Sequence, residues 1–163
     1  MIIIGGILLS KEANYRITNK QLAAVIGSET NLIANLSNAA ALLFENLPDI
    51  NWSGFYLYEE SSGELVLGPF QGKVACIRIG IGKGVCGTAF EKNKTLLVED
   101  VNQFQGHIAC DAASQSEIVI PLTINGKKIG VLDIDAPITN RFDKVDQQFL
   151  EQFVKILLKN NQA

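Results

Sequence analysis

Apolar residues recur at helical spacing toward both ends of the chain. The pattern predicts a first helix over residues 18–26, which Gly27 ends. A longer helix is predicted between Ser28, which can cap it, and Pro48, with one apolar stripe made of Leu32, Ile33, Leu36, Ala40 and Leu43. A last helix, capped by Asp143, presents a second stripe made of Val145, Phe149, Phe153, Ile156 and Leu157.

Aromatic and β-branched runs between these helices predict two β-hairpins. The second hairpin has the clearer turn, because Asn125-Gly126 suits a type I′ turn, in which both central residues need a positive φ. The four predicted strands are residues 52–58 and 65–67, which flank residues 61–63, and residues 117–123 and 128–135.

The segment between the hairpins, residues 69–116, is rich in glycine and mostly irregular. It contains a predicted short strand at 77–79, a short helix at 85–92 and a strand at 95–98. These elements give an α+β fold, in which a mostly antiparallel sheet has the terminal helices on one face and this long segment on the other. A loop-rich segment of that length in a compact domain is usually functional.

Composition narrows the class of protein. The chain has 163 residues, of which 47% are hydrophobic and 19% charged, which is typical of one globular domain that needs no disulfide or metal to stay folded. A formal net charge of −3 argues against nucleic-acid binding. No apolar run reaches the roughly 20 residues that a membrane-spanning helix needs.

The first nine residues are apolar but lack the basic flank and the small-residue cleavage site of a secretory signal. We therefore expect residues 1–12 to be an atypical N-terminal extension and residues 13–163 to form a single domain. Without a signal, the expected compartment is the cytoplasm. Cysteines in that reducing compartment are more often catalytic or metal-binding than structural.

All three cysteines, Cys76, Cys86 and Cys110, lie in the long middle segment. Their spacing matches no Cys-x-x-Cys motif, and each taken singly is more often a small buried hydrophobe. Cys86, however, lies in the glycine-rich turn 82–87, where a helix N-terminus is expected to lower its pKa. Cys110 follows His107 by three residues, and Cys76 is predicted to begin a strand. Three thiols on the segment that covers the sheet suggest thiol redox chemistry.

The second hairpin carries three acidic residues, Glu117, Asp133 and Asp135. The two aspartates are two residues apart on a strand, so they share a face of the sheet. Spacing alone leaves two interpretations equally open: the acid face is exposed to solvent, or it is covered. If it is covered, burial and mutual repulsion raise at least one carboxyl pKa toward neutrality.

Aromatic residues gather on the first predicted strand. Trp52, Phe55 and Tyr56 most often serve core packing, but Trp and Tyr also line pockets that use their polar tips.

Several of these segments together resemble the free methionine-(R)-sulfoxide reductases, a family built on the GAF domain. The resemblance runs from about Asn14 to the last helix. The segments that carry it are residues 52–56, Gly68-Pro-Phe-Gln-Gly-Lys73, 82–87, Gly106-His-Ile-Ala-Cys-Asp-Ala-Ala-Ser114, 116–119 and Gly130-Val-Leu-Asp-Ile-Asp135.

The resemblance implies reduction of free methionine (R)-sulfoxide by an enzyme without metal or organic cofactor, with thioredoxin as the reductant. It implies that Cys110 is the nucleophile, Cys76 its main disulfide partner and Cys86 an additional redox cysteine. The implied substrate-binding residues are Glu117, Asp133, Asp135, Trp52 and Tyr56. By analogy with other GAF proteins, we also expect a homodimer.

Sulfoxide reduction fits these residue types, because it takes two electrons, which thiols supply, and two protons, and it releases water. The expected donor of the proton to the sulfoxide oxygen is Asp135 or Glu117, with Asp133 orienting it. Two alternatives remain. Many GAF domains bind a small ligand without converting it, and fold alone does not separate the two functions. A zinc site with three cysteines and one histidine is the other alternative, for which Cys76, Cys86, Cys110 and His107 have the right count but a loose spacing.

Overall fold

The computed structural model describes residues 2–4, 7–106, 108 and 112–161. The prediction that falls on Cys110 and His107 lies outside the described residues. The described helices and strands, in chain order, are β1 (Ile2–Ile4), β2 (Ile7–Leu9), α1 (Lys11–Ile26), α2 (Leu32–Asn46), β3 (Trp52–Glu59), β4 (Glu64–Gly72), β5 (Arg78–Gly80), α3 (Gly84–Lys92), β6 (Leu96–Val98), the 3-10 helix Val101–Gln103, β7 (Ser116–Ile124), β8 (Lys127–Ala136), α4 (Lys144–Leu158) and the 3-10 helix Lys159–Asn161.

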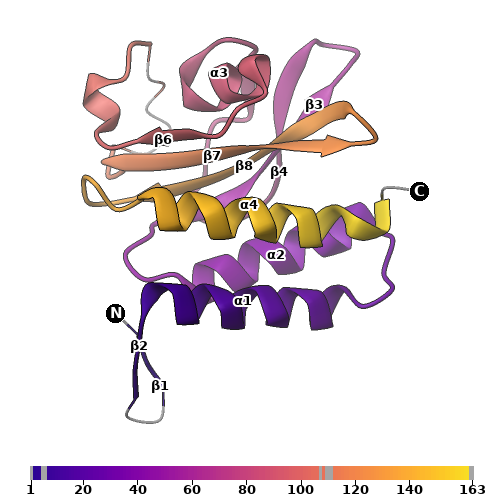
Figure 1. Ribbon diagram of the computed structural model, residues 1–163. Helices are drawn as coiled ribbons and strands as arrows, with labels where there is room; N and C mark the ends of the chain where they lie inside the picture. Colours follow the sequence, from indigo (N-terminus) through magenta and orange to yellow (C-terminus); the bar gives the residue numbers. More distant parts are fainter. Residues whose placement is uncertain (1, 5–6, 107, 109–111, 162–163) are drawn as a thin grey trace.

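A curled sheet forms the centre of the fold (Figure 1), and its described strands follow the order β5-β4-β3-β8-β7-β6. Every neighbouring pair is antiparallel. Both predicted hairpins are confirmed, as β3–β4 and β7–β8. Asn125 and Gly126 have φ values of 50° and 78°, as the predicted type I′ turn requires.

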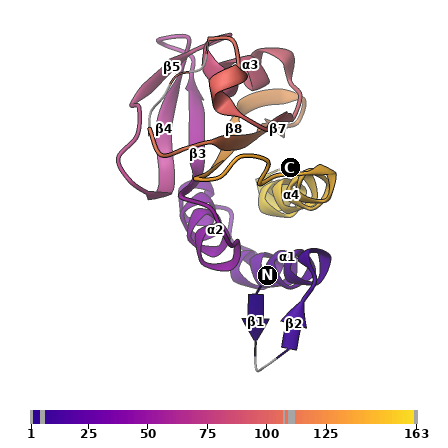
Figure 2. The ribbon, with the colours of Figure 1, turned by 90° about the vertical axis from the view of Figure 1, so that its left-hand side faces the viewer.

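Helices α2 and α4 pack on one face of the sheet, and α1 packs on these two helices on the side away from the strands (Figure 2). The larger core lies between them and the strands, and it includes Leu36, Phe55, Leu132 and Phe153, each fully buried. Helix α4 begins as predicted: the Asp143 side chain accepts hydrogen bonds from the backbone N–H groups of the first turn and forms a capping box with Asp146.

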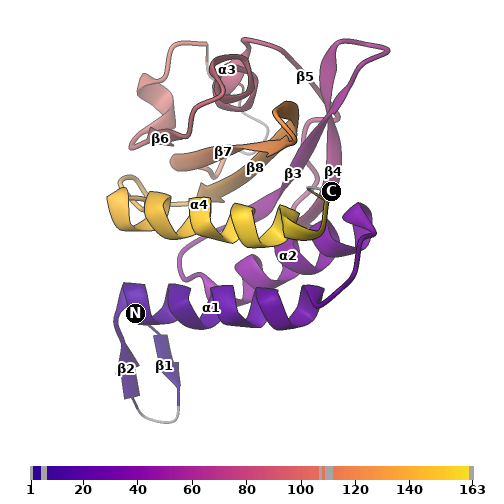
Figure 3. The same cartoon turned by 45° about the vertical axis from the view of Figure 1, so that its right-hand side comes forward.

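On the opposite face, α3 lies over β7 and β8, and β5 extends the sheet beside β4 (Figure 3). A second, smaller core lies on this side and includes Trp52, Tyr56, Val85, Cys86 and Val131. The predicted α+β architecture, with helices on one face and the loop-rich segment on the other, is therefore confirmed.

The predicted beginnings of the first two helices are wrong. Helix α1 begins at Lys11, not at residue 18, and its earlier turns bury Asn14, whose polar side chain hides the helical stripe from a hydrophobicity pattern. Helix α2 is capped by Asn31 rather than Ser28, because the Asn31 side chain accepts a hydrogen bond from the backbone N–H of Ala34.

Strands β1 and β2 form a separate two-stranded sheet that extends from the start of α1 away from the main sheet (Figure 1). The division of the chain after residue 12 stays a prediction. No helix in the described part of the chain is long and apolar enough to span a membrane.

Candidate active site

Strand register brings the three acidic residues together on the face that α3 covers. Glu117 on β7 is paired with Asp135 on β8, and Asp135 is paired in turn with Trp52 on β3. Asp133 lies two residues from Asp135 and therefore points to the same side. It is paired with Gly54. Of the two interpretations of the acid face, the covered one is correct, since Glu117 is 5% exposed and Asp133 6% exposed.

Gly54, the β3 residue paired with Asp133, leaves room for the Trp52 ring. A Cβ atom at this position would overlap Cβ of Phe70 and lie 2.7 Å from Cη2 of Trp52. Strand β4 therefore approaches β3 closely here, and the indole ring occupies the room that a side chain at Gly54 would take. Sequence reasoning missed this residue, although a glycine inside a predicted strand indicates a close approach of another chain segment.

The aromatic residues of β3 also attach the loop that carries Cys76 to the sheet. Trp52 Nε1 donates a hydrogen bond to the backbone carbonyl of Lys73 at 3.1 Å. The Tyr56 hydroxyl donates one to the backbone carbonyl of Cys76 at 2.9 Å. Trp52 stacks on Phe70 with ring centroids 5.3 Å apart. The prediction that Cys76 begins a strand is wrong: it lies in the loop before β5, where these two anchors hold the backbone.

The glycine-rich turn delivers Cys86 to the same cavity. Gly82 and Gly84 have positive φ values of 75° and 57°, which lets the chain turn sharply into α3. A Cβ on Gly87 would overlap the carbonyl oxygen of Gly80, so only glycine allows this packing. Cys86, in the first turn of α3, thereby points its thiol at Glu117, with Sγ 3.9 Å from Oε1.

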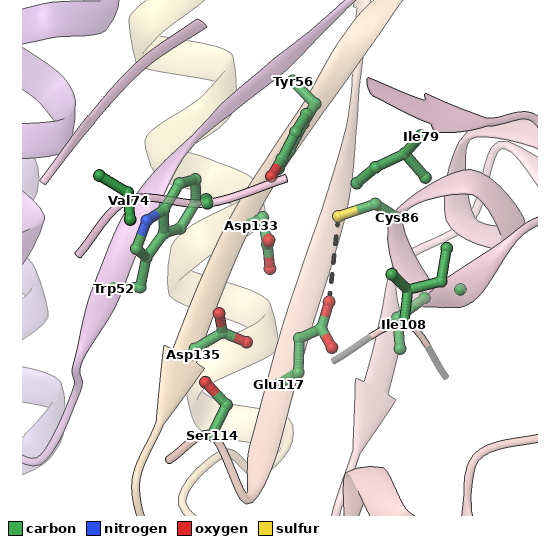
Figure 4. A pocket seen from close by; sticks show the side chains of 13 residues that line it. Trp52, Tyr56, Val74, Ile79, Cys86, Ile108, Ser114, Glu117, Asp133 and Asp135 are labelled. Carbon is green, nitrogen blue, oxygen red and sulfur yellow. Dashed lines mark hydrogen bonds between the residues drawn. The ribbon is translucent and has the colours of Figure 1, made fainter. Parts of the chain in front are cut away.

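These side chains surround one cavity, shown in Figure 4. Its volume accessible to a water-sized sphere is about 40 Å³, within about 530 Å³ of atom-free space that includes solvent. The aromatic side chains lie on one side of it, the carboxyl groups form its floor, and Cys86 and Ile108 lie opposite the aromatic rings. The lining residues are Trp52, Tyr56, Val74, Ala75, Ile79, Gly84, Val85, Cys86, Ile108, Ser114, Glu117, Asp133 and Asp135.

Burial makes this cavity unfavourable for negative charge. Removal from water raises the pKa of Glu117 well above its ordinary value, and repulsion from Asp133 and Asp135 raises it further. Burial likewise raises the pKa of Asp133 to about 6, although hydrogen bonds from Cys86 and Glu117 act in the opposite direction. The predicted upward shift of at least one carboxyl pKa is confirmed, for both Glu117 and Asp133.

The predicted lowering of the Cys86 pKa is wrong. Burial raises the pKa of this thiol well above its usual range, and the charges of Asp133 and Glu117 add to the effect. The favourable field at the N-terminus of α3 does not compensate for the loss of water around a fully covered sulfur. In this state Cys86 is therefore a protonated hydrogen-bond donor.

The two described cysteines differ in redox state. Cys76 is disulfide-bonded, whereas Cys86 is a free, buried thiol. A disulfide sulfur is not a thiolate ligand, so Cys76 in this state does not serve the proposed zinc site of three cysteines and one histidine. Another set of ligand-type atoms does converge among the described residues: Sγ of Cys86 and carboxylate oxygens of Glu117 and Asp133 lie within 4.8 Å of one another.

Comparison with known proteins identifies the family. A GAF-domain family model matches residues 34–157. The chain is 52% identical to the free methionine-R-sulfoxide reductase of Escherichia coli, over 93% of this chain and 90% of that protein.

Two solved structures share the fold over nearly their whole length. The fRMsr of Staphylococcus aureus in its reduced form has a TM-score of 0.88 at 58% identity, covering 92% of this chain and 96% of that one. The free methionine-R-sulfoxide reductase of Neisseria meningitidis, in complex with its substrate, has a TM-score of 0.91 at 45% identity, covering 98% and 95%. The chain therefore belongs to the GAF-domain family, in the group that contains the free methionine-R-sulfoxide reductases.

Proposed function

We propose that this protein reduces free L-methionine (R)-sulfoxide to L-methionine, using cysteine thiols that thioredoxin regenerates. The observation that carries the proposal is a buried carboxyl group with a raised pKa, Glu117, in a cavity lined by two further acids. Cys76, which is disulfide-bonded, follows the lining residue Ala75 directly. The named reductases of E. coli and N. meningitidis, at 52% and 45% identity, support the same substrate.

The acid floor suits a free amino acid. Methionine sulfoxide carries an ammonium group, and Asp135, which is half-buried at the edge of the cavity, is suited to pair with it. Its carboxylate requires backbone N–H groups, which the turn 82–87 or residues 112–114 are suited to supply. A cavity that encloses both charged ends excludes methionine sulfoxide within a protein chain.

Protonation of the sulfoxide oxygen is assigned to Glu117 rather than Asp135. A sulfoxide oxygen leaves poorly until it is protonated, so a carboxylic acid that is neutral at working pH is the required donor. The raised pKa of Glu117 meets this requirement. Asp133, which is buried next to it, orients the Glu117 carboxyl group.

Cysteine sulfur atoms supply the two electrons of the proposed reduction. The Cys110 thiolate attacks the sulfoxide sulfur and takes the oxygen, which yields methionine and a cysteine sulfenic acid. The Cys76 thiol condenses with this sulfenic acid, forming a disulfide and releasing water. A thioredoxin dithiol then reduces the disulfide. Cys76 is the preferred partner over Cys86, because Cys76 is in a disulfide and Cys86 is a buried thiol with a raised pKa.

The decisive experiment is to incubate the protein with dithiothreitol and each epimer of free methionine sulfoxide, and to quantify the methionine formed. The (R) epimer is expected to be consumed and the (S) epimer to persist. N-acetyl methionine sulfoxide tests the need for a free ammonium group and is expected to be a poor substrate. Equal turnover of both epimers, or binding without turnover, would overturn the proposal and favour a ligand-binding GAF domain.

Variants then test the roles. Cys110→Ser is expected to abolish turnover, and full activity in it would contradict its assignment as nucleophile. Glu117→Gln is expected to lower kcat roughly 100- to 10,000-fold, the range for loss of a general acid. The matched control is Glu45→Gln, an exposed position on α2, away from the cavity.

A further inference from the structure

The three groups that converge in the cavity differ in chemical type. They are one sulfur atom, from Cys86, and two carboxyl groups, from Glu117 and Asp133, on three different elements: α3, β7 and β8. Their potential ligand atoms all lie within 4.8 Å of one another, and all three residues are buried. Ligand atoms on a tetrahedral ion at about 2.0–2.3 Å lie roughly 3.3–3.8 Å apart, so atoms now up to 4.8 Å apart must approach one another by up to about 1.5 Å.

A second observation points to a ligand at this place. Among the residues that the structure describes, Oδ1 of Asp133 has no hydrogen-bond partner, although the residue is only 6% exposed. Buried polar atoms in proteins almost always have a partner, so an unpartnered carboxyl oxygen calls for one that the protein does not supply. In Figure 4 the Asp133 carboxyl group points into the cavity, on the side where the Cys86 sulfur and the Glu117 carboxyl group lie.

Space for such a ligand is present. The cavity offers about 40 Å³ to a water-sized sphere, and one water needs roughly 10–15 Å³ by this measure. A single metal ion with one or two bound waters therefore fits without moving the sheet.

We propose that Cys86, Glu117 and Asp133 form an inhibitory binding site for a borderline-soft divalent metal ion, with Zn²⁺ as its natural ligand. A thiolate with two carboxylates favours Zn²⁺ over Mg²⁺ or Ca²⁺, which prefer oxygen ligands alone. Three protein ligands leave a fourth tetrahedral position for water. Binding displaces the thiol proton and any proton on the carboxyl groups, and these protons pass to solvent.

The consequence for catalysis rests on the proposed function. The ion occupies the floor of the cavity and bonds the carboxyl group that is assigned to protonate the sulfoxide. A bound ion therefore both excludes the substrate from the cavity and prevents Glu117 from donating a proton. Zn²⁺ thus inhibits the reductase in competition with methionine sulfoxide.

Cobalt provides a direct test, because Co²⁺ replaces Zn²⁺ in tetrahedral sites and a thiolate ligand gives it a near-ultraviolet charge-transfer band. The protein is titrated with Co²⁺ in its disulfide form, without added thiols, so that Cys76 does not act as a ligand. We expect one Co²⁺ per chain with that band and with intense tetrahedral visible bands. Zn²⁺ is expected to displace Co²⁺ stoichiometrically, whereas Mg²⁺ in large excess is not.

Variants identify the ligands. Cys86→Ser is expected to abolish the charge-transfer band. Asp133→Asn and Glu117→Gln are expected to keep it but to weaken Co²⁺ binding by more than about 100-fold, since loss of even an outer partner of a metal ligand costs roughly 10–100-fold. If Cys86→Ser fails to fold, these two variants decide the question. Glu45→Gln is the matched control and is expected to bind like the wild type.

The proposal is overturned if no thiolate band forms, if the band survives in Cys86→Ser, or if Mg²⁺ competes as well as Zn²⁺. Its failure is distinguishable from failure of the proposed function. Metal binding is read by spectroscopy without substrate, and reductase activity is read with a chelator present. A single-turnover assay on the pre-reduced, desalted enzyme then links the two, with inhibition by Zn²⁺ that excess methionine (R)-sulfoxide relieves.

Discussion

Replacing Asp133 by asparagine is expected to stabilise the protein at neutral pH. Burial raises the pKa of this carboxyl group from its ordinary value of 3.8 to about 6. The folded state thus binds the proton more tightly than the unfolded state does. Below about pH 4 both states are protonated and the shift has no effect on stability. As pH rises from about 4 to about 6, the unfolded state ionises while the folded state still holds the proton, so the folded state loses stability. Above pH 6 both states are ionised and the loss levels off.

The size of the effect follows from the pKa difference. The change from 3.8 to about 6 corresponds to roughly 3 kcal/mol in the free energy of unfolding above pH 6. Asparagine cannot ionise, but its amide is still a buried polar group, so we expect a net gain of about 1–3 kcal/mol. For a domain of this size that gain raises Tm by roughly 2–4 °C per kcal/mol.

The assay is urea denaturation of the wild type and Asp133→Asn between pH 4 and pH 8, with a chelator present. The difference in the free energy of unfolding is expected to be smallest at pH 4 and to grow with pH until it levels off above pH 6. Glu45→Gln, the exposed control, is expected to follow the wild type throughout. A difference that does not depend on pH, or a variant less stable than the wild type at pH 8, would refute the reasoning.

Three further substitutions test how the structure supports the site. Gly54→Ala places a methyl group against Phe70 and is expected to cost about 1–3 kcal/mol of stability, as overpacking does, measured by the urea midpoint. Tyr56→Phe removes the hydrogen bond to the Cys76 carbonyl; a loss of about 1 kcal/mol and several-fold slower disulfide formation are expected in a quenched thiol-trapping assay, and unchanged kinetics would argue against an anchoring role. Asp146→Ala removes the partner of the buried Arg141 and is expected to cost roughly 3–5 kcal/mol in thermal unfolding, while activity per folded molecule is unchanged.

Local patterns predicted the elements whose signals lie in a few neighbouring residues. The Asn125-Gly126 turn and the Asp143 cap are confirmed because turn and cap preferences arise from backbone conformation and short-range hydrogen bonds. The first half of α1 was missed for a tertiary reason. Asn14, in the missed half, is buried because its side-chain amide donates to the carbonyl of Asn46 at the end of α2, so a polar residue lies where the hydrophobicity pattern requires an apolar one.

Of the site residues predicted from the sequence, the structure brings Trp52, Tyr56, Cys86, Glu117, Asp133 and Asp135 to one cavity, but the sequence did not decide which of these groups are buried. Strand periodicity places Asp133 and Asp135 on one face, yet it does not say whether that face is covered. The helix position of Cys86 predicts a lowered pKa, and the structure reverses this, because burial against two carboxyl groups outweighs the field of the helix.

The amino-acid sequence by itself determined the two hairpins, the last helix, the α+β layering and the set of thiols and acids in the covering segment and the second hairpin. Only the tertiary structure decided that α3 packs over the acid face, that Gly54 leaves room for the indole, and that Cys86, Glu117 and Asp133 converge. The physical reason is the distance along the chain over which each property is determined. Turns and caps depend on neighbours within a few residues, whereas burial and the pKa values that follow from it depend on segments far apart in the chain that exclude water together.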